Sequence, residues 1–276
     1  MQTTQKERDQ KKIKVKIKNK KKEIKKFSKK TTKNKITLYF YEDTHEYIDS
    51  RNKKYISVTT LIKKYFPFDE YQVAKEISER NGDPIDLILN HWKYIRDTAC
   101  EHGNNVHFSC ETFIKENKIL EFQKDKTNNC VLTAIDFLLS DINKYGKIIS
   151  CEKLLFDSEN LIAGQCDLVL RKGNTLIIGD WKTNEKLSRE SFDNQTGLYP
   201  LNKIPNCDFY KYFIQLNIYL YLIIKNNLYP WAEDYKLIIF HIKERKVIPH
   251  YLNIDLKLIE EVIKNYSKYN TNYHSK

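Results

Sequence analysis

Two neighbouring apolar segments in the middle of the chain carry the charged residues best suited to chemistry. The first leads into Asp167, and the second ends in Asp180 and, two positions later, Lys182. If these segments are strands joined by a two-residue turn at Lys172-Gly173 or Gly173-Asn174, they pair antiparallel. Either turn places the two aspartates on one face, directly opposed or one step diagonal, so their carboxylates converge.

The lysine belongs to the same group. Side chains alternate along a strand, so Lys182 shares the face of Asp180 while Trp181 points away. Two carboxylates beside an ammonium group could coordinate Mg²⁺ and orient or activate a water molecule. The alternative is that an aspartate at a strand end is a turn residue and that the Asp-x-Lys spacing arose by chance. The apolar run at residues 176–178 favours the site, because a buried strand that ends in charges needs a reason for them.

Residues 56–222 resemble the PD-(D/E)XK nuclease superfamily, in its RecB-like branch. An ordered set of motifs carries the resemblance: Gly103, His107 and Glu111 in GNNVHFSCE, then Asp167, then GDWKTNEK at residues 179–186, then a helix with Gln215 and Tyr219. Within this branch the chain is most similar to the mitochondrial genome maintenance exonuclease type, which SVTTLI at residues 57–62 and Phe192-Asp193-Asn194 also resemble.

The resemblance implies a role for each matching residue. Asp167 and Asp180 would hold Mg²⁺ or Mn²⁺, with His107 and the carbonyl oxygen of Trp181 completing the set of ligands. Lys182 would orient or deprotonate the attacking water. The catalytic candidates are Asp167, Asp180, Lys182 and Glu111, with Glu152, at the start of the first strand of the predicted core, as a weaker one. The candidates for substrate binding are Gln215, Tyr219 and Thr183.

Helical spacing agrees with two of these pairs but leaves other readings open. His107 and Glu111 lie four residues apart and would project from one face of a helix. Outside the family context they would be a packing histidine and a solvated carboxylate. Gln215 and Tyr219 are likewise one turn apart in an apolar helix, where the buried amide needs a partner. That partner would be a DNA phosphate, Lys182, or a group that ties the helix to the sheet.

The basic charge of the chain is concentrated near its N-terminus. The net charge is +12, and residues 1–35 hold 16 Lys or Arg against 3 acidic residues. Mutual repulsion and a shortage of apolar side chains predict a disordered tail over residues 1–35. Such a tail would attract nucleic acid phosphates, act as a nuclear-import address, or be a dispensable solubilising arm. In a chain of 276 residues that is 41% hydrophobic, residues 36–276 suffice for a single nuclease domain.

Several other classes of protein fit the sequence poorly. No stretch reaches the roughly 18 apolar residues needed to span a bilayer. We therefore expect a soluble intracellular protein, cytoplasmic or nuclear, with a mitochondrial location left open. The six cysteines contain no Cys-x-x-Cys pair, which argues against structural zinc and a disulfide framework. The cysteine cluster that holds an iron–sulfur cluster in some RecB-like nucleases is missing from the sequence, so we expect no such cluster.

The hydrophobic periodicity predicts an α/β (α+β) fold, with a PD-(D/E)XK core in which a central mixed β-sheet is flanked by helices. A β-hairpin at 36–56 and further helices would precede this core. The predicted helices are 57–65, 69–80, 84–117 with a break near Gly103, 130–145, one around Gln215, and 255–269. The predicted strands are 148–156, 161–170, 175–182 and 237–242. A long loop at 184–208 carries aromatic residues that could stack on bases or simply cover the core.

These observations predict a Mg²⁺- or Mn²⁺-dependent DNA nuclease. We expect an exonuclease that acts on single-stranded DNA ends in replication, repair or recombination. One alternative is a structure-selective endonuclease. Another is a catalytically silent nucleic-acid-binding protein, against which the intact Asp167, Asp180 and Lys182 argue.

Overall fold

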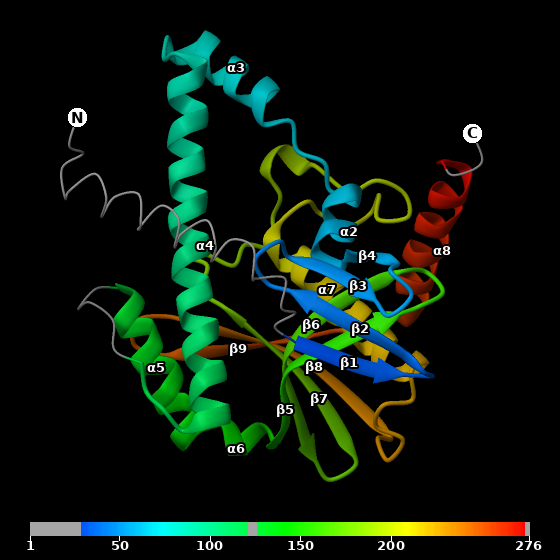
Figure 1. Ribbon diagram of the computed structural model, residues 1–276. Coiled ribbons are helices and arrows are strands. Elements are labelled where there is room, and N and C mark those ends of the chain that lie inside the picture. Colours follow the sequence, from blue (N-terminus) through cyan, green and yellow to red (C-terminus); the bar gives the residue numbers. More distant parts are fainter. Residues whose placement is uncertain (1–28, 121–125, 274–276) are drawn as a thin grey trace, which may run out of the picture. The chain divides into compact units, whose positions relative to one another are not determined.

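The computed structural model describes residues 29–120 and 126–273, and it divides into two compact units at Tyr55 and Ile56 (Figure 1). The smaller unit is an antiparallel meander of β1 (Lys29–Lys33), β2 (Ile36–Tyr41) and β3 (Glu46–Asp49), to which the first half of β4 (Lys54–Ser57) adds. The predicted hairpin at 36–56 therefore contains one more strand than expected.

The predicted basic tail needs a correction at its end. Residues 1–28 lie outside the described part of the chain, but Lys29–Lys33 forms β1 and pairs with β2. This last portion is a strand and not a disordered tail: Lys29, Thr31 and Lys33 share a half-buried face, and Lys30 and Thr32 alternate with them on the exposed face.

The larger unit is built on a mixed β-sheet, as the sequence predicts. Strands β5 (Lys147–Asp157), β6 (Ile162–Lys172) and β7 (Thr175–Lys182) are antiparallel to one another in turn. Strand β8 (Asp234–Ile242) runs parallel to β7, and β9 (Val247–Leu252) is antiparallel to β8. Strand β9 was not predicted, since Pro249 lowers the strand signal; it pairs only with β8, and edge strands tolerate proline.

Strand β6 pairs with β5 along one edge and with two strands, β4 and β7, along the other edge. One edge pairs with β5 over most of its length. On the other edge, Ile162 and Ala163 pair with the second half of β4, and Leu168–Lys172 pairs with β7. Residues 164–167 lie between these two ladders. The metal-binding candidate Asp167 therefore stands where β6 is paired with neither β4 nor β7.

Helices cover both faces of this sheet (Figure 1). On one face, α2 (Val58–Tyr65), α7 (Asp208–Lys225) and α8 (Leu256–Tyr273) pack on a core that includes Leu176 and Ile178 of β7. On the other face, α4 (Ile85–Glu116), α5 (Lys126–Ser140) and α6 (Ile142–Tyr145) pack on a core that includes Ile177 and Trp181. The alternation of side chains along β7 thus supplies two separate cores.

Most helices lie where the sequence predicts them, with two corrections. Ser57 caps α2 by accepting a hydrogen bond from the Thr60 N–H at 3.0 Å, and α3 (Glu70–Asn81) ends at Gly82 in a left-handed conformation. Helix α4 is continuous through Gly103, where a break was predicted. The predicted helix at 130–145 is instead two helices, α5 and α6, separated at Asp141.

The long loop after β7 contains a short 3-10 turn, η1 (Phe192–Asn194), and an isolated antiparallel β-bridge between Thr196 and Pro205. Among the described helices, none combines the length and apolar character needed to cross a membrane.

Candidate metal centre

The turn between β6 and β7 sets the register of the site. Lys172 pairs with Thr175, so Gly173 and Asn174 form the two-residue turn, and Gly173 has the positive φ of 61° that such turns favour. This is one of the two predicted turns, and it makes Asp167 directly opposed to Asp180. The hydrogen-bonded ladder ends just before them, at Leu168 opposite Gly179.

Beyond the end of this ladder, the side chain of Asp167 connects β6 to β7. Its Oδ2 accepts a hydrogen bond from the backbone N–H of Trp181 at 2.9 Å. The side chain of Asp167 thereby bridges two strands that are no longer joined by backbone hydrogen bonds. The Trp181 ring points away, as predicted, and packs with Phe137 and Phe240 in the core under α5.

Asp180 and Lys182 form a nearly buried ion pair. Asp180 is 1% exposed, and the Lys182 side chain is 14% exposed. Burial raises the pKa of Asp180 above its ordinary value and outweighs the opposing effect of the lysine. For Lys182, burial alone would lower the pKa, but the nearby carboxylates of Asp180 and Asp167 outweigh burial and raise it. The ammonium group also lies 4.5 Å from the ring centroid of Tyr212.

Helix α4 brings His107 to these strands. His107 Nε2 donates to the carbonyl oxygen of Trp181 at 2.8 Å, and Nδ1 lies 3.3 Å from Asp167 Oδ2. Both ring nitrogens therefore face oxygen acceptors. A neutral imidazole carries only one N–H, so it cannot donate to both. A cation that shares these oxygens would relieve the mismatch.

Glu152 completes the cluster from β5. It lies between the pairs Cys151 with Leu168 and Lys153 with Cys166, and so stands across from Asp167. One ligand atom each from His107, Glu152 and Asp167 lie within 4.8 Å of one another. The prediction that Glu152 begins the strand is wrong, because β5 starts at Lys147. The φ of Glu152 is 53°, a left-handed value that is rare for a non-glycine residue in a strand and typical of functional sites.

The residues present fit a divalent cation. Carboxylate oxygens, a carbonyl oxygen and an imidazole nitrogen are ligands that Mg²⁺ and Mn²⁺ accept. The buried Oδ1 of Asp180 has no hydrogen-bond partner within the described residues, and an unpaired buried carboxylate oxygen is costly unless a cation meets it.

Comparison with known families decides what this site belongs to. Residues 96–271, which include every residue of the cluster, match the model of the PD-(D/E)XK nuclease superfamily. The chain is a PD-(D/E)XK nuclease. As a member of this superfamily it is a phosphodiester hydrolase with a nucleic acid substrate, and superfamily members use divalent metal ions.

Solved structures give fainter similarities to this PD-(D/E)XK nuclease. A presumed exonuclease from Eubacterium rectale is 14% identical, with a TM-score of 0.42 and 79% of each chain covered. The protein SSO0001 is 16% identical, with a TM-score of 0.28 and coverage of 79% of this chain and 76% of that one. A phage-related exonuclease from Haemophilus somnus 129PT is 12% identical, with a TM-score of 0.32 and coverage of 80% and 95%. A search of curated proteins finds no match.

The remaining candidates of this PD-(D/E)XK nuclease lie around the cluster in different ways. Glu111, one turn beyond His107 on α4, forms an ion pair with Lys115 and is not part of the three-residue ligand group. The Oγ1 of Thr183 lies against Gly103 of α4, 3.4 Å from where a Cβ would stand.

The two residues on α7 are more deeply buried than a phosphate contact requires. Gln215 is 8% exposed and Tyr219 is 3% exposed, and Gln215 Nε2 donates to the Tyr219 hydroxyl at 3.0 Å. The amide therefore has a partner on its own helix, which was not among the partners predicted for it. Tyr219 also packs against Gly164 of β6, so the pair lies at the contact between α7 and the sheet.

Proposed function

We propose that this PD-(D/E)XK nuclease is a Mg²⁺- or Mn²⁺-dependent deoxyribonuclease of the RecB-like branch that removes nucleotides from single-stranded DNA ends. The observation that carries the proposal is the convergence of His107, Asp167, Asp180 and Lys182 where β6 and β7 cease to pair. Replication, repair and recombination are the processes that generate such ends. Such a substrate fits an intracellular place of action, cytoplasmic, nuclear or mitochondrial.

The metal ion would be held by residues from one helix and three strands. His107, Asp167, Asp180 and the carbonyl oxygen of Trp181 are the proposed ligands, and Glu152 is within reach to join them. When bound, a divalent cation supplies charge neutralisation at the phosphate and a more acidic water molecule. We propose the same residues as ligands for either Mg²⁺ or Mn²⁺.

Lys182 lies beside the proposed metal ligands and would act on the water or the phosphate from there. Its ammonium group is held by Asp180 and by the face of Tyr212, so it is fixed in position at the edge of the site. A fixed ammonium donor can orient the attacking water or hold a phosphate oxygen, and preorganised donors of this kind need little rearrangement during the reaction. Glu111 would act through its neighbours and not on the metal. Thr183, Gln215 and Tyr219 would shape the wall along which the strand lies.

Preference for a single strand is supported by the loop at 184–208. Its first residue, Asn184, is fixed by the Tyr212 hydroxyl, which donates to its Oδ1 at 2.8 Å, and by His241, whose Nε2 donates to its carbonyl oxygen at 2.7 Å. Phe192 and Tyr199 farther along are 72% and 68% exposed. Exposed aromatic rings on a segment anchored beside the site could stack on unpaired bases, at about 1–3 kcal/mol per base.

We also propose that residues 36–276, together with β1, act as the nuclease domain and that residues 1–28 serve mainly to attract nucleic acid. The matched family region, 96–271, lies inside this range.

The test compares linear and circular single-stranded DNA, each labelled, with Mg²⁺, Mn²⁺ or EDTA. We expect nucleotides to be released from linear DNA only when metal is present, while circular DNA stays intact and RNA of the same sequence is cut more slowly. Phe192→Ala and Tyr199→Ala should reduce cleavage of single strands, whereas Leu198→Ala, an exposed aliphatic change in the same loop, should not. Cleavage of circular DNA would favour an endonuclease. Binding with no cleavage under any condition would favour a silent binding protein.

A further inference from the structure

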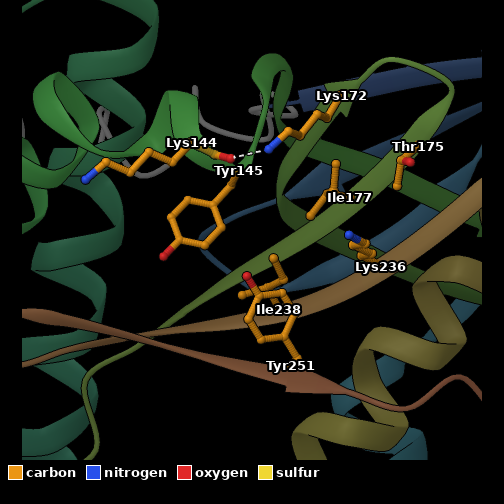
Figure 2. Close-up of a pocket in the computed structure, with 8 residues that line it drawn as sticks. All are labelled: Lys144, Tyr145, Lys172, Thr175, Ile177, Lys236, Ile238 and Tyr251. Carbon is orange, nitrogen blue, oxygen red and sulfur yellow. Dashed lines mark hydrogen bonds between the residues drawn. The ribbon is translucent and has the colours of Figure 1, made fainter.

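A pocket lies on the face of the sheet that carries α6, over the first residues of β7 and β8 (Figure 2). Its volume is about 250 Å³. Strand β7 contributes Thr175 and Ile177, which lie five and three residues before Asp180, so the lining of the pocket begins about 10 Å from Asp180 along the strand. The pocket is lined by Lys144, Tyr145, Lys172, Thr175, Ile177, Lys236, Ile238 and Tyr251.

The lower part of the pocket is apolar and rigid. Ile177 and Ile238 are each 1% exposed and form its floor. The Tyr145 ring is fixed from behind by Phe137 and Phe240, at centroid distances of 5.7 and 5.1 Å. Figure 2 shows Tyr145 and Tyr251 on adjoining sides of this floor. A flat ring-bearing ligand could rest on these side chains without rearranging them.

The rim of the pocket is positively charged. Lys144 forms an ion pair with Asp141, and Lys172 Nζ donates to the carbonyl oxygen of Lys144 at 2.7 Å, which fixes its position (Figure 2). Within the described part of the chain, no carboxylate lies within ion-pairing distance of Lys172 or Lys236. Two such ammonium groups at one opening repel each other, and a phosphate between them would relieve the repulsion.

We propose that this pocket binds one nucleotide. Lys172 and Lys236 would hold its phosphate, and Tyr145 and Tyr251 would contact its base. The shared chemistry, a phosphate joined to a flat ring, is offered both by a free mononucleotide and by one unit of a nucleic acid chain. Thr175 and Ile177 point to the opposite face of β7 from Asp180, so the bound nucleotide is not the one being cleaved. The pocket is therefore a second site, separate from the proposed function.

The test measures binding directly and does not use cleavage. Full-length protein in EDTA is titrated into a fluorescent derivative of deoxyadenosine 5′-monophosphate, and anisotropy is followed. Unlabelled deoxyadenosine 5′-monophosphate, deoxyadenosine, inorganic phosphate and a single-stranded oligonucleotide compete in separate arms. The variants are Lys236→Gln, Lys172→Gln and Tyr251→Ala, all at exposed positions, and the matched control is Lys257→Gln, an exposed lysine on α8.

We expect each lysine variant to bind the nucleotide about tenfold more weakly, as loss of one charge-assisted contact does, and the control to bind normally. Tyr251→Ala should weaken binding of the nucleotide and leave competition by inorganic phosphate unchanged. Stronger displacement by the oligonucleotide would identify a nucleic acid chain as the source, and stronger displacement by the mononucleotide would identify a free nucleotide. Equal binding by all variants, or equal competition by phosphate and nucleotide, would overturn the proposal.

Discussion

At the scale of single residues, three acidic side chains lie on three adjacent strands, β5, β6 and β7. Glu152 stands across from Asp167, and Asp167 stands across from Asp180. Three carboxylates brought together in this way repel one another unless a cation lies among them. Lys182 supplies one positive charge, and His107 faces two oxygen acceptors. The three carboxylates thus outnumber the nearby positive charges, and a bound cation would balance them.

The first prediction concerns Asp180. Asp180→Asn should reduce cleavage at least about a hundredfold, because it removes a proposed metal ligand and the partner of Lys182. DNA binding should stay within a few-fold, since contacts to phosphates lie elsewhere. Single-turnover cleavage and filter binding measure the two effects, with Asp136→Asn on the exposed face of α5 as the control. A variant that cleaves nearly as fast as the parent would remove Asp180 from the site.

The second prediction ranks two glutamates. Glu152→Gln should raise the Mg²⁺ or Mn²⁺ concentration for half-maximal activity about tenfold, because Glu152 belongs to the ligand group with His107 and Asp167. Glu111→Gln should shift this concentration less, since Glu111 is paired with Lys115. Metal titrations of both variants test the ranking. The reverse order would return Glu111 to the position that the motif on α4 suggests.

The third prediction concerns a buried carboxylate outside the site. Asp157 is 2% exposed and accepts hydrogen bonds from Lys225 Nζ at 2.8 Å and Asn160 Nδ2 at 2.6 Å. Burial alone would raise its pKa, but these hydrogen bonds outweigh burial and hold the pKa below the ordinary 3.8. A lowered pKa stabilises the folded state above the ordinary value, and this contribution is lost as pH falls through the lowered one.

Asp157→Asn should therefore lower the free energy of unfolding by about 1–3 kcal/mol at pH 7. The difference from the parent should shrink as pH falls below about 4 and through the lowered pKa of Asp157, where the folded parent also becomes protonated. Urea unfolding at several pH values measures it, and Asp136→Asn again serves as an exposed control. A constant difference down to pH 3 would mean that packing, and not charge, explains the loss.

At the scale of elements, close packing of α7 on β6 positions the buried pair of Gln215 and Tyr219. A Cβ on Gly164 would lie 2.7 Å from Tyr219 Cε1 and 3.0 Å from Val58 Cγ2. Gly164→Ala should destabilise the protein by about 1–3 kcal/mol, because helix and strand must move apart. Gly103→Ala is the matched control: its Cβ meets nothing closer than 3.4 Å, and alanine in a helix should be neutral or stabilising.

Thermal or urea unfolding of the two glycine variants measures the contrast. Equal stability of both variants would mean that α7 can shift without cost, and the close approach at Gly164 would lose its importance.

The sequence predicts elements best where a local rule fixes the geometry. A two-residue turn at Lys172-Gly173 or at Gly173-Asn174 brings Asp167 and Asp180 together on one face, and only the structure chooses direct over diagonal opposition. Glu152 is different. Its place across from Asp167 depends on an irregularity in β5 between Ile148 and Ser150 that shifts the register, and no residue type announces it.

Two further elements show why tertiary contacts override local signals. Gly103 predicts a weak point in α4, yet the helix continues, since Val106 and Cys110 just beyond it are buried against α5. Pro249 argues against a strand, yet β9 forms because its partner β8 lies on only one side. In both cases the neighbouring element, and not the local sequence, decides.

At the scale of the whole molecule, charge is divided between the N-terminal segment and the nuclease domain. Residues 1–28 hold 12 Lys or Arg against 3 acidic residues. Deleting them, with β1 kept intact, should weaken DNA binding and flatten its dependence on salt. Each lost phosphate contact lowers the slope of log K against log salt by about 0.7 on single strands. Cleavage at saturating DNA should be unchanged, because the metal cluster lies far along the chain.

Binding measured over a range of salt concentrations tests this separation. The matched comparison is a full-length protein in which the same lysines and arginines are replaced by glutamine. If both proteins keep the DNA affinity and the salt slope of the parent, an import address or a passive extension becomes the better explanation of the segment.

The place of His107 on α4 has a consequence for mechanics. The other proposed ligands belong to the sheet, so a bound cation would be a reversible cross-link between a helix and three strands. By mass action, the cation would then favour every state in which α4 is docked over those in which it has swung away. Metal concentration would set the stiffness of the protein as well as its chemistry, and the enzyme would be most rigid when it is ready to react.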